Sequence, residues 1–214
     1  MMMRADTRIQ LASDVRWGVR KRPQQTRSRE TVERILAAGR AVLTDDGYDA
    51  FSTNRVAAVA EISPGSLYQY FADKTSILDQ VIDRYWEEVS ERTTAALAER
   101  IGGAGESMVR SVADALLASL EEDPALLRVL VEELPASRNR TRRAALVARV
   151  RDLTAAYLGG RPAEIGRSDP SVAAWVLVVA IENIALRWVL DRPPYSRDAV
   201  LQEIVALAEG YLSP

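Results

Sequence analysis

Neutral polar side chains are gathered between residues 52 and 74, where they could form hydrogen bonds with phosphate oxygens and base edges. After the Ser-Pro pair at 63–64, the chain carries such groups on Tyr68, Gln69 and Tyr70. Hydroxyl and amide groups near the start of a helix suit phosphates and base edges, and the helix dipole adds attraction for anions. These residue types at this spacing predict contact with a nucleic acid.

Two short helices must position these side chains. Ser52-Thr53 offers an N-cap for a helix that reaches about residue 60, and Ser63-Pro64 starts a second helix that reaches about residue 70. Apolar residues in this segment have the spacing needed to pack inward against a preceding helix: Val56, Ala57, Ala60, Ile62, Leu67 and Phe71. A second helix backed by such a small core can enter a DNA major groove, which is about 12 Å wide. The pattern is that of a helix-turn-helix.

Residues 63–78 read Ser-Pro-Gly-Ser-Leu-Tyr-Gln-Tyr-Phe-Ala-Asp-Lys-Thr-Ser-Ile-Leu. This run resembles the recognition helix and the start of the fourth helix of the TetR (tetracycline-repressor) family of transcriptional regulators. The run Ile35–Ala38 and Gly47 also fit the first helix of that family. The specific resemblance covers about residues 26–82 at many fixed spacings, whereas the rest of the chain matches only in layout.

The resemblance implies a DNA-binding surface on the two short helices. Thr53 and Asn54 lie where the family's second helix contacts DNA backbone and bases, and Tyr68 and Lys74 lie where the family grips phosphate. Gln69 could pair bidentately with adenine, which is worth about 1–3 kcal/mol of discrimination between bases. The implied DNA-binding residues are Thr53, Asn54, Ser63, Pro64, Gly65, Ser66, Tyr68, Gln69, Tyr70 and Lys74.

One residue departs from the family pattern. Glu61 stands in the turn where the family commonly has Gly. If that position needs a positive φ, Glu costs on the order of 1 kcal/mol there. A slightly different turn is the other way to accommodate it.

Helical spacing of apolar residues runs along the whole chain, without a convincing strand. We expect a first helix over about 24–43, with Gly47 as its C-terminal breaker. After the two short helices we expect six more, over about 73–100, 109–120, 124–134, 139–158, 170–190 and 197–212. The predicted fold is all-α with about nine helices, a three-helix N-terminal head and a six-helix C-terminal body.

The charge distribution supports this division. Residues 1–74 hold 12 Lys+Arg and 9 Asp+Glu, whereas residues 75–214 hold 16 and 21. We expect a flexible basic arm over 1–23, a DNA-binding domain over 24–72, and a ligand-binding and dimerisation domain over 73–214. The arm either contacts phosphates and the minor groove or only keeps a tail solvated, and both readings stay open.

Composition argues against an enzyme. The 214-residue chain has no Cys and no His, which removes thiol chemistry, Ser-His-Asp triads and the commonest metal ligand. Gly102–Gly105 precedes a helix but follows no strand, so its value as a nucleotide-binding loop is poor. Adjacent carboxylates such as Glu87-Glu88 diverge by about 100° on a helix and are read as solvated surface. We expect no catalytic residue, no metal and no cofactor.

A membrane location is not expected. Residues 1–14 contain no apolar run of the signal-peptide kind. The longest apolar stretch, Val172–Ile181, has ten residues and ends at Glu182, whereas a bilayer span takes about 20. The expected location is the cytoplasm, with association to the nucleoid through DNA.

The family resemblance also implies a small effector inside the helical body. The residues assigned to this site are Trp86, Met108, Leu117, Leu127, Val131, Val150, Trp175 and Asn183. Glu182 and Asn183 interrupt the most apolar helix, and serve either a dimer interface or a ligand. The arginines between Arg138 and Arg151 are read as a solvated helix face, with an anion or acidic-partner site as the alternative.

Together these expectations describe a sequence-specific, DNA-binding transcriptional regulator. As in the family, we expect a homodimeric repressor that a small, apolar effector releases from a near-palindromic operator in double-stranded DNA; the sequence does not distinguish a repressor from an activator. The two helices over 170–190 and 197–212 would form a four-helix dimer interface with their mates. The alternative is a helical small-molecule-binding protein that has lost sequence-specific DNA binding.

Overall fold

The computed structural model describes residues 26–100, 108–162 and 165–213 of the chain. The predicted arm over 1–23 and the Gly102–Gly105 loop lie outside the described residues. Within those residues the chain forms nine α-helices, one π-helical segment (η1) and no strand, which confirms the all-α prediction. The elements are α1 (Thr26–Asp46), α2 (Thr53–Val59), α3 (Pro64–Tyr70), α4 (Lys74–Arg100), α5 (Met108–Glu121), α6 (Pro124–Arg128), η1 (Val129–Glu133), α7 (Ala136–Gly159), α8 (Pro170–Asp191) and α9 (Arg197–Leu212).

Side-chain caps determine where several helices begin. The hydroxyls of Ser52 and Ser63 each accept a hydrogen bond from the backbone N–H three residues on, at the starts of α2 and α3. Asp123, Asp169 and Ser196 cap α6, α8 and α9 with their side-chain oxygens. These five helix starts are local consequences of the sequence, and all five match the predicted start signals.

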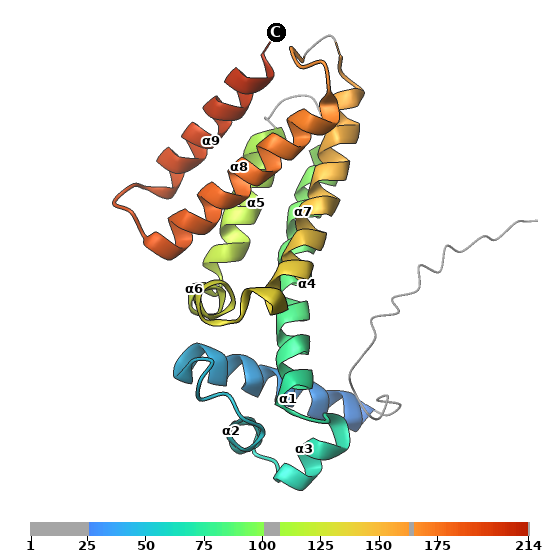
Figure 1. The fold of residues 1–214 in the computed structure, drawn as a ribbon, viewed down its shortest axis with the longest axis vertical. Helices are drawn as coiled ribbons and strands as arrows, with labels where there is room; N and C mark the ends of the chain where they lie inside the picture. The colour runs from blue at the N-terminus through green and yellow to red at the C-terminus, as the bar shows by residue number, and fades with distance from the viewer. Residues whose placement is uncertain (1–25, 101–107, 163–164, 214) are drawn as a thin grey trace, which may run out of the picture.

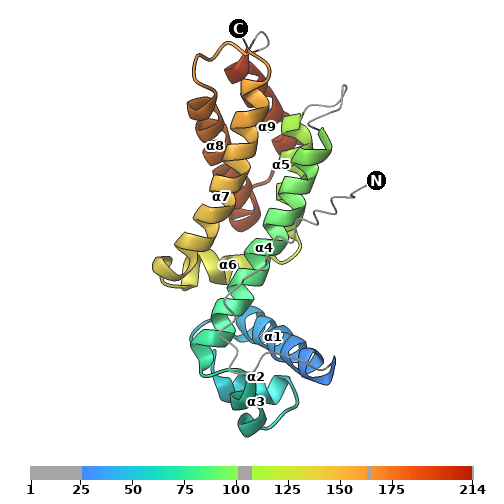
Figure 2. The ribbon, with the colours of Figure 1, turned by 90° about the vertical axis from the view of Figure 1, so that its right-hand side faces the viewer.

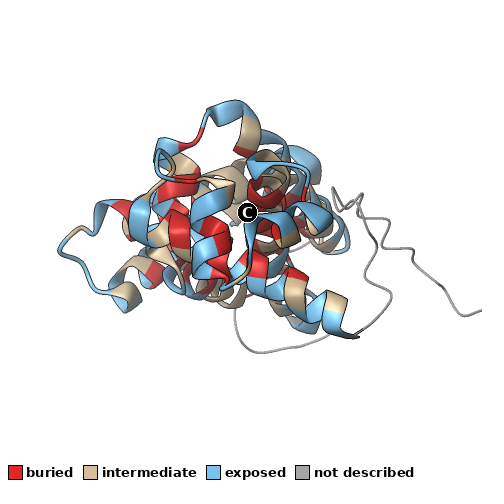
Figure 3. Ribbon diagram, turned by 90° about the horizontal axis from the view of Figure 1, so that it is seen from below, coloured by how far each residue is buried: buried red, intermediate tan, exposed pale blue. Residues whose placement is uncertain are grey.

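Helices α1–α3 form a head at one end of an elongated molecule, and α4 runs from the head into a body made of α4–α9 (Figure 1). In the body, α4 packs against α5 and α7, while α8 packs against α5 and α7 and α9 packs against α5 (Figure 2). Buried residues line the inward sides of the helices (Figure 3). The hydrophobic core is continuous from Val32 in α1 to Ala208 in α9. Helix α4 therefore packs in both the head and the body.

Gly47 shows how closely the body approaches the head. The residue follows α1 with a φ of +79°, which favours glycine, so the predicted helix breaker is confirmed. A Cβ atom at Gly47 would lie 3.2 Å from Oε2 of Glu133 in η1. The same carboxylate oxygen accepts a hydrogen bond from the backbone N–H of Tyr48 at 3.0 Å. The turn after α1 is thus held by the body.

The predicted helix over 124–134 is not a uniform α-helix. Its second half, η1, has π-helical hydrogen bonding, and the N–H of Leu134 donates to the carbonyl of Val129 at 3.0 Å. The buried side chain of Asn139 donates from Nδ2 to the carbonyl of Leu130 at 2.9 Å. Its Oδ1 accepts a hydrogen bond from Nε1 of Trp86. Apolar spacing could not reveal this π-turn because its stabilising partner lies on α7.

The prediction that no segment is long enough to span a membrane considered too short a stretch, because it counted only the run Val172–Ile181. Helix α8 as a whole has 22 residues and a mean hydropathy of 1.8 over its most apolar window, so by length and composition alone it could cross a membrane. Such a test is also passed by core helices of helical proteins, and α8 packs its buried side on α5 and α7.

Candidate nucleic-acid interface

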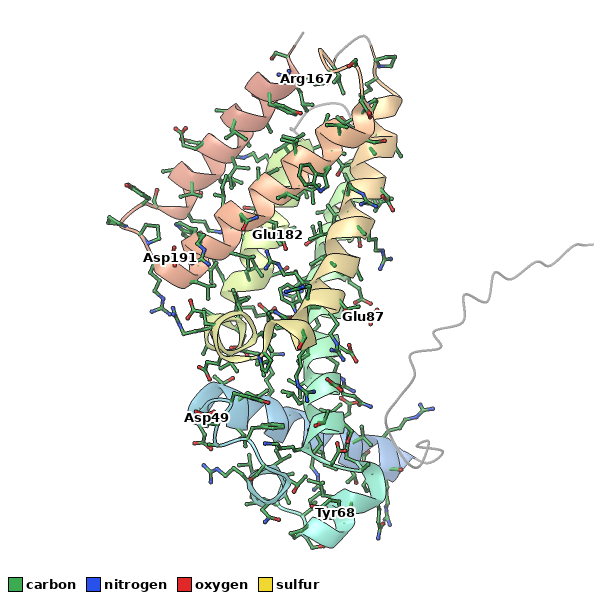
Figure 4. The ribbon with its side chains drawn as sticks, in the orientation of Figure 1. Asp49, Tyr68, Glu87, Arg167, Glu182 and Asp191 are labelled. Atoms are coloured by element: carbon green, nitrogen blue, oxygen red, sulfur yellow. The ribbon has the colours of Figure 1, made fainter. Side chains whose placement is uncertain are left out.

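The exposed surface of α2 and α3 lies at the end of the molecule farthest from the body, where Figure 4 labels Tyr68. Behind it, Val56, Leu67 and Phe71 are fully buried. Tyr68 itself is 44% exposed although it is a large aromatic residue. A hydrogen bond of 3.1 Å joins its hydroxyl to Oγ1 of Thr53 on α2. This bond links the two short helices on the outer side of the turn.

The ten predicted DNA-binding residues lie on α2, on α3 and its N-cap, and at the start of α4, and we call them the recognition face. Asn54, Ser63, Pro64, Gly65, Tyr68, Gln69 and Lys74 are exposed, whereas Thr53, Ser66 and Tyr70 are partly exposed. The hydroxyls of Ser63 and Ser66 lie 2.9 Å apart in a mutual hydrogen bond. Because a hydroxyl can both donate and accept, each retains capacity for another partner. Tyr70 also packs on the core through its ring.

Lys74 has a contact that sequence reasoning did not predict. Its ammonium nitrogen donates to the carbonyl of Phe51 at 3.4 Å and lies 5.9 Å from the centroid of the Tyr48 ring. Both partners belong to the segment between α1 and α2. The charge of Lys74 therefore ties the start of α4 to the rest of the head, while the side chain stays exposed.

The turn between α2 and α3 has the strain anticipated for it. Glu61 has a φ of 54°, in the left-handed region that favours glycine. Its backbone N–H still bonds to Ala58, and the N–H of Ile62 bonds to Ala57 at 3.0 Å. The turn is thus formed with Glu at the strained position.

Ion pairs stabilise the head internally and also join it to the body. Within the head, Nε of Arg55 lies 2.6 Å from Asp46 at the end of α1, and this guanidinium lowers the pKa of the Asp46 carboxyl. Between head and body, Nε of Arg40 donates to Asp123 at 2.8 Å. Asp123 also caps α6, so one carboxylate holds both α1 and the start of α6.

The body contains a small, mainly apolar space, which we call the inner cavity. Its volume is about 40 Å³, and its lining residues are Thr93, Leu116, Leu146, Val147, Val150, Val178, Ile181 and Glu182. Glu182 lies 2.6 Å from Nε of Arg143 on α7, an ion pair that the sequence did not reveal.

The predicted effector residues do not form one group. Val150 lines the inner cavity, while Trp86 lines a separate groove between α4 and α7. Met108, Leu117 and Leu127 are buried in the core, and Val131 is partly buried in η1. Trp175 and Asn183 lie on the exposed side of α8, where Trp175 is 54% exposed and Asn183 donates to the carbonyl of Val179. The structure therefore does not bring these two residues to the cavity.

Most arginines of α7 are engaged in ion pairs rather than only solvated. Arg138 and Arg142 pair with Asp79, and Arg142 also pairs with Asp83, so both bridge α7 to α4. Arg151 pairs with its neighbour Asp152. The basic cluster thus contributes to the packing of α4 on α7.

Sequence models of two families match this chain. The model described as "Bacterial regulatory proteins, tetR family" matches residues 35–81, and the one described as "Tetracyclin repressor-like, C-terminal domain" matches residues 106–212. The chain belongs to the TetR family. As a member of it, the protein is a helix-turn-helix, DNA-binding transcriptional regulator, and this family is generally not one of enzymes.

Individual relatives agree with the family assignment. The HTH-type transcriptional regulator CymR of Pseudomonas putida is 26% identical over 83% of this TetR-family chain and 90% of its own length. The HTH-type transcriptional repressor KstR of Mycolicibacterium smegmatis is 31% identical over 48% of this chain and 49% of its own. A crystal structure of a TetR-family regulator from Mesorhizobium loti has the same fold, with a TM-score of 0.70, 21% identity, and coverage of 87% of this chain and 97% of that one.

Proposed function

We propose that this TetR-family regulator is a homodimeric repressor that binds a near-palindromic operator and releases it when a small effector enters the body. The observation that carries the proposal is the recognition face, whose α3 part presents exposed neutral donors and acceptors on a short helix backed by fully buried Leu67 and Phe71. Such a helix can place Gln69 against base edges while its neighbours contact phosphates.

The repressor role is supported by relatives. KstR is named a transcriptional repressor, and EbrR, a multidrug binding protein crystallised with imidazole, shares the fold with a TM-score of 0.61, 23% identity, and coverage of 82% of this chain and 93% of its own. By analogy we assign residues 24–72 to DNA binding and residues 73–214 to effector binding and dimerisation, in a protein acting in the cytoplasm without catalysis.

The dimer is supported by the outer sides of α8 and α9. Val172 and Trp175 on α8 and Leu207 on α9 are about half exposed in the single chain although they are large and apolar. Pairing these helices with their copies would cover that apolar surface. A two-fold dimer places two recognition helices about 34–36 Å apart, which requires two half-sites one helical turn apart.

The connection between effector and DNA is proposed to run through α6 and η1. This segment and its N-cap contact α1 through Asp123 and the turn after α1 through Glu133, and Nη2 of Arg128 donates to the carbonyl of Leu190 near the end of α8 at 2.6 Å. An effector can change DNA affinity only by as much as it favours one arrangement of these contacts over another.

The test is a fluorescence-anisotropy titration of the purified protein against DNA from upstream of its own gene, with scrambled DNA as the control, at several salt concentrations. We expect one dimer to bind one near-palindrome far more tightly than the scrambled DNA. Equal, steeply salt-dependent binding to both DNAs would show electrostatic contact alone and would contradict the proposal.

A further inference from the structure

A groove between α4 and α7 provides a binding surface separate from the inner cavity. Its volume is about 420 Å³, and its lining residues are Asp83, Trp86, Glu87, Ser90, Arg142, Ala145, Leu146 and Arg149. We propose that this α4–α7 groove is the docking site for a small dipolar molecule with an aromatic body, and that Leu146 is the gate between the groove and the inner cavity. The inference rests on the proposed function in one respect, since it takes this molecule to be the effector.

Size favours the groove over the cavity as the first site of contact. Small-molecule sites in proteins usually measure about 300–1,000 Å³. The inner cavity, at about 40 Å³, has room for little more than one water molecule, whereas the groove at about 420 Å³ falls within the usual range. In the arrangement described, the groove alone of these two spaces can accept an organic molecule.

The aromatic part of the groove lining is held in place, and Trp86 contributes only 4% of its surface to solvent there. The Trp86 side chain is held by the hydrogen bond from its Nε1 to the buried side chain of Asn139. Ala145 and Leu146 on α7 add apolar surface opposite, and Ser90 on α4 adds a hydroxyl. An aromatic ring could pack on the small exposed part of Trp86, because aromatic rings prefer to stack or to meet edge to face.

The charges of the groove indicate a dipolar ligand. Asp83 and Arg142 both line the groove and pair with each other. Glu87 on α4 and Arg149 on α7 are both exposed, and in the part of the chain that the structure describes neither has an ion-pair partner. A molecule with one cationic and one anionic group can pair with both walls. A singly charged molecule leaves one wall without a partner.

Leu146 separates the two spaces because it lines both of them. Figure 4 labels Glu87 on α4 and Glu182 on α8, of which the first lines the groove and the second lines the cavity. Leu146 is buried, and Val147 and Val150 follow it on the cavity side. A change in its side-chain position would join the groove to the apolar cavity, where the aromatic body of a ligand could then be buried.

The test uses four probes that share one fluorophore and differ in charge. They are ε-dansyl-lysine (dipolar), dansylcadaverine (cationic), dansylglycine (anionic) and dansylamide (neutral), each titrated into the full-length protein by fluorescence. We expect ε-dansyl-lysine to bind most tightly. Arg149→Ala should weaken ε-dansyl-lysine and dansylglycine by two- to fivefold, as for one exposed ion pair, and leave dansylcadaverine unchanged. Glu87→Ala should weaken ε-dansyl-lysine and dansylcadaverine instead.

Matched controls lie on the same two helices. Arg140→Ala on α7 and Glu91→Ala on α4 remove exposed charges outside the groove and should change none of the four affinities. Leu146→Ala should speed association of ε-dansyl-lysine several-fold by opening the gate. Since that variant can also lose stability, Ala145→Trp at an exposed position provides a second test and should block the groove.

Two readouts separate this proposal from the proposed function. Absence of probe binding would overturn the groove as a ligand site, even if the same protein binds its operator. Equal binding of all four probes, with affinities unchanged in Arg149→Ala, Glu87→Ala and Ala145→Trp, would overturn it as well. The expected probe pattern in a protein that does not distinguish operator from scrambled DNA would support the groove as a ligand site and overturn the repressor.

Discussion

On the recognition face, side chains are positioned by hydrogen bonds between neutral hydroxyls, whereas across α4 and α7 they are positioned by ion pairs between arginine and aspartate. Thr53 bonds to Tyr68 over a separation of 15 residues, while Arg142 reaches Asp83 over a separation of 59. The first kind of contact leaves hydroxyl capacity for DNA, and the second kind consumes the charges that it uses. The recognition face is therefore arranged by contacts between residues close in the sequence, whereas the body is held by ion pairs between residues far apart in it.

The largest expected effect comes from removing the core behind the recognition face. Phe71→Ala removes a fully buried ring, and we expect it to lower the free energy of unfolding by about 3–5 kcal/mol. Urea unfolding followed by circular dichroism measures this loss, and anisotropy measures operator binding by the fraction that remains folded. Leu117→Ala, at a fully buried position in α5, is the matched change in the body, with an expected cost of about 2–5 kcal/mol.

The folded fraction of Phe71→Ala should lose operator affinity much more than that of Leu117→Ala. An equal loss in both variants would contradict this expectation, because it would show that the head and the body determine DNA affinity to the same extent.

A smaller effect should distinguish base reading from phosphate contact within the recognition face. Gln69→Ala should remove about 1–3 kcal/mol of preference at one operator position, because an amide can pair bidentately with adenine. Binding to a set of single-base operator variants measures this preference. A uniform loss on every sequence would assign Gln69 to positioning instead.

Lys74→Ala tests phosphate contact, as Gln69→Ala tests base reading. If Lys74 contacts phosphate, binding should weaken on all sequences and the slope of log affinity against log salt should fall by about 1. If its role is limited to the contacts with Phe51 and Tyr48, the salt slope should stay unchanged while stability falls.

A still smaller effect concerns the strained turn. Glu61→Gly should raise the free energy of unfolding by about 0.5–1 kcal/mol, because glycine adopts the observed φ of 54° without steric cost but loses more entropy on folding. Glu61→Ala keeps the strain and removes the side chain, so urea unfolding should show almost no gain. Equal gains in both variants would attribute the effect to the Glu61 side chain rather than to the backbone.

The smallest expected effect is a pH dependence of the contact between α1 and α4. The hydrogen bond and the charge of Arg84 lower the pKa of the Glu33 carboxyl below its ordinary value of 4.5. The folded state therefore favours the ionised form, so this stabilisation is present above pH 4.5 and is lost as the pH falls through the lowered pKa. Because the pair is largely exposed, its contribution is at most about 1 kcal/mol.

Urea unfolding of the wild type and of Glu33→Gln between pH 7 and pH 3 measures this term. The stability difference between them should shrink toward the acid end. A difference that stays constant over the whole range would remove Glu33 from the acid response.

Much of the head was predictable because its determinants are local. Ser52 and Ser63 are followed within three residues by the N–H groups that they cap, and Gly47 takes the positive φ that its position after α1 indicates. Apart from Lys74 at the start of α4, the residues of the recognition face lie on two helices only a short turn apart, so their approximate grouping follows from helical periodicity. Their roles toward DNA remain predictions.

The helices, most of their starts and the exposed polar surface of α3 are therefore predictable from the residue order, since they depend on neighbours within a few residues. Which residues of the body meet depends instead on how the helices pack. Trp175 lies outside while Val150 lines the inner cavity, Asn139 holds both a π-turn and Trp86, and Leu146 lines two spaces at once. Apolar periodicity shows which side of a helix is buried, but the facing partner depends on how distant helices cross, and no local pattern carries that information.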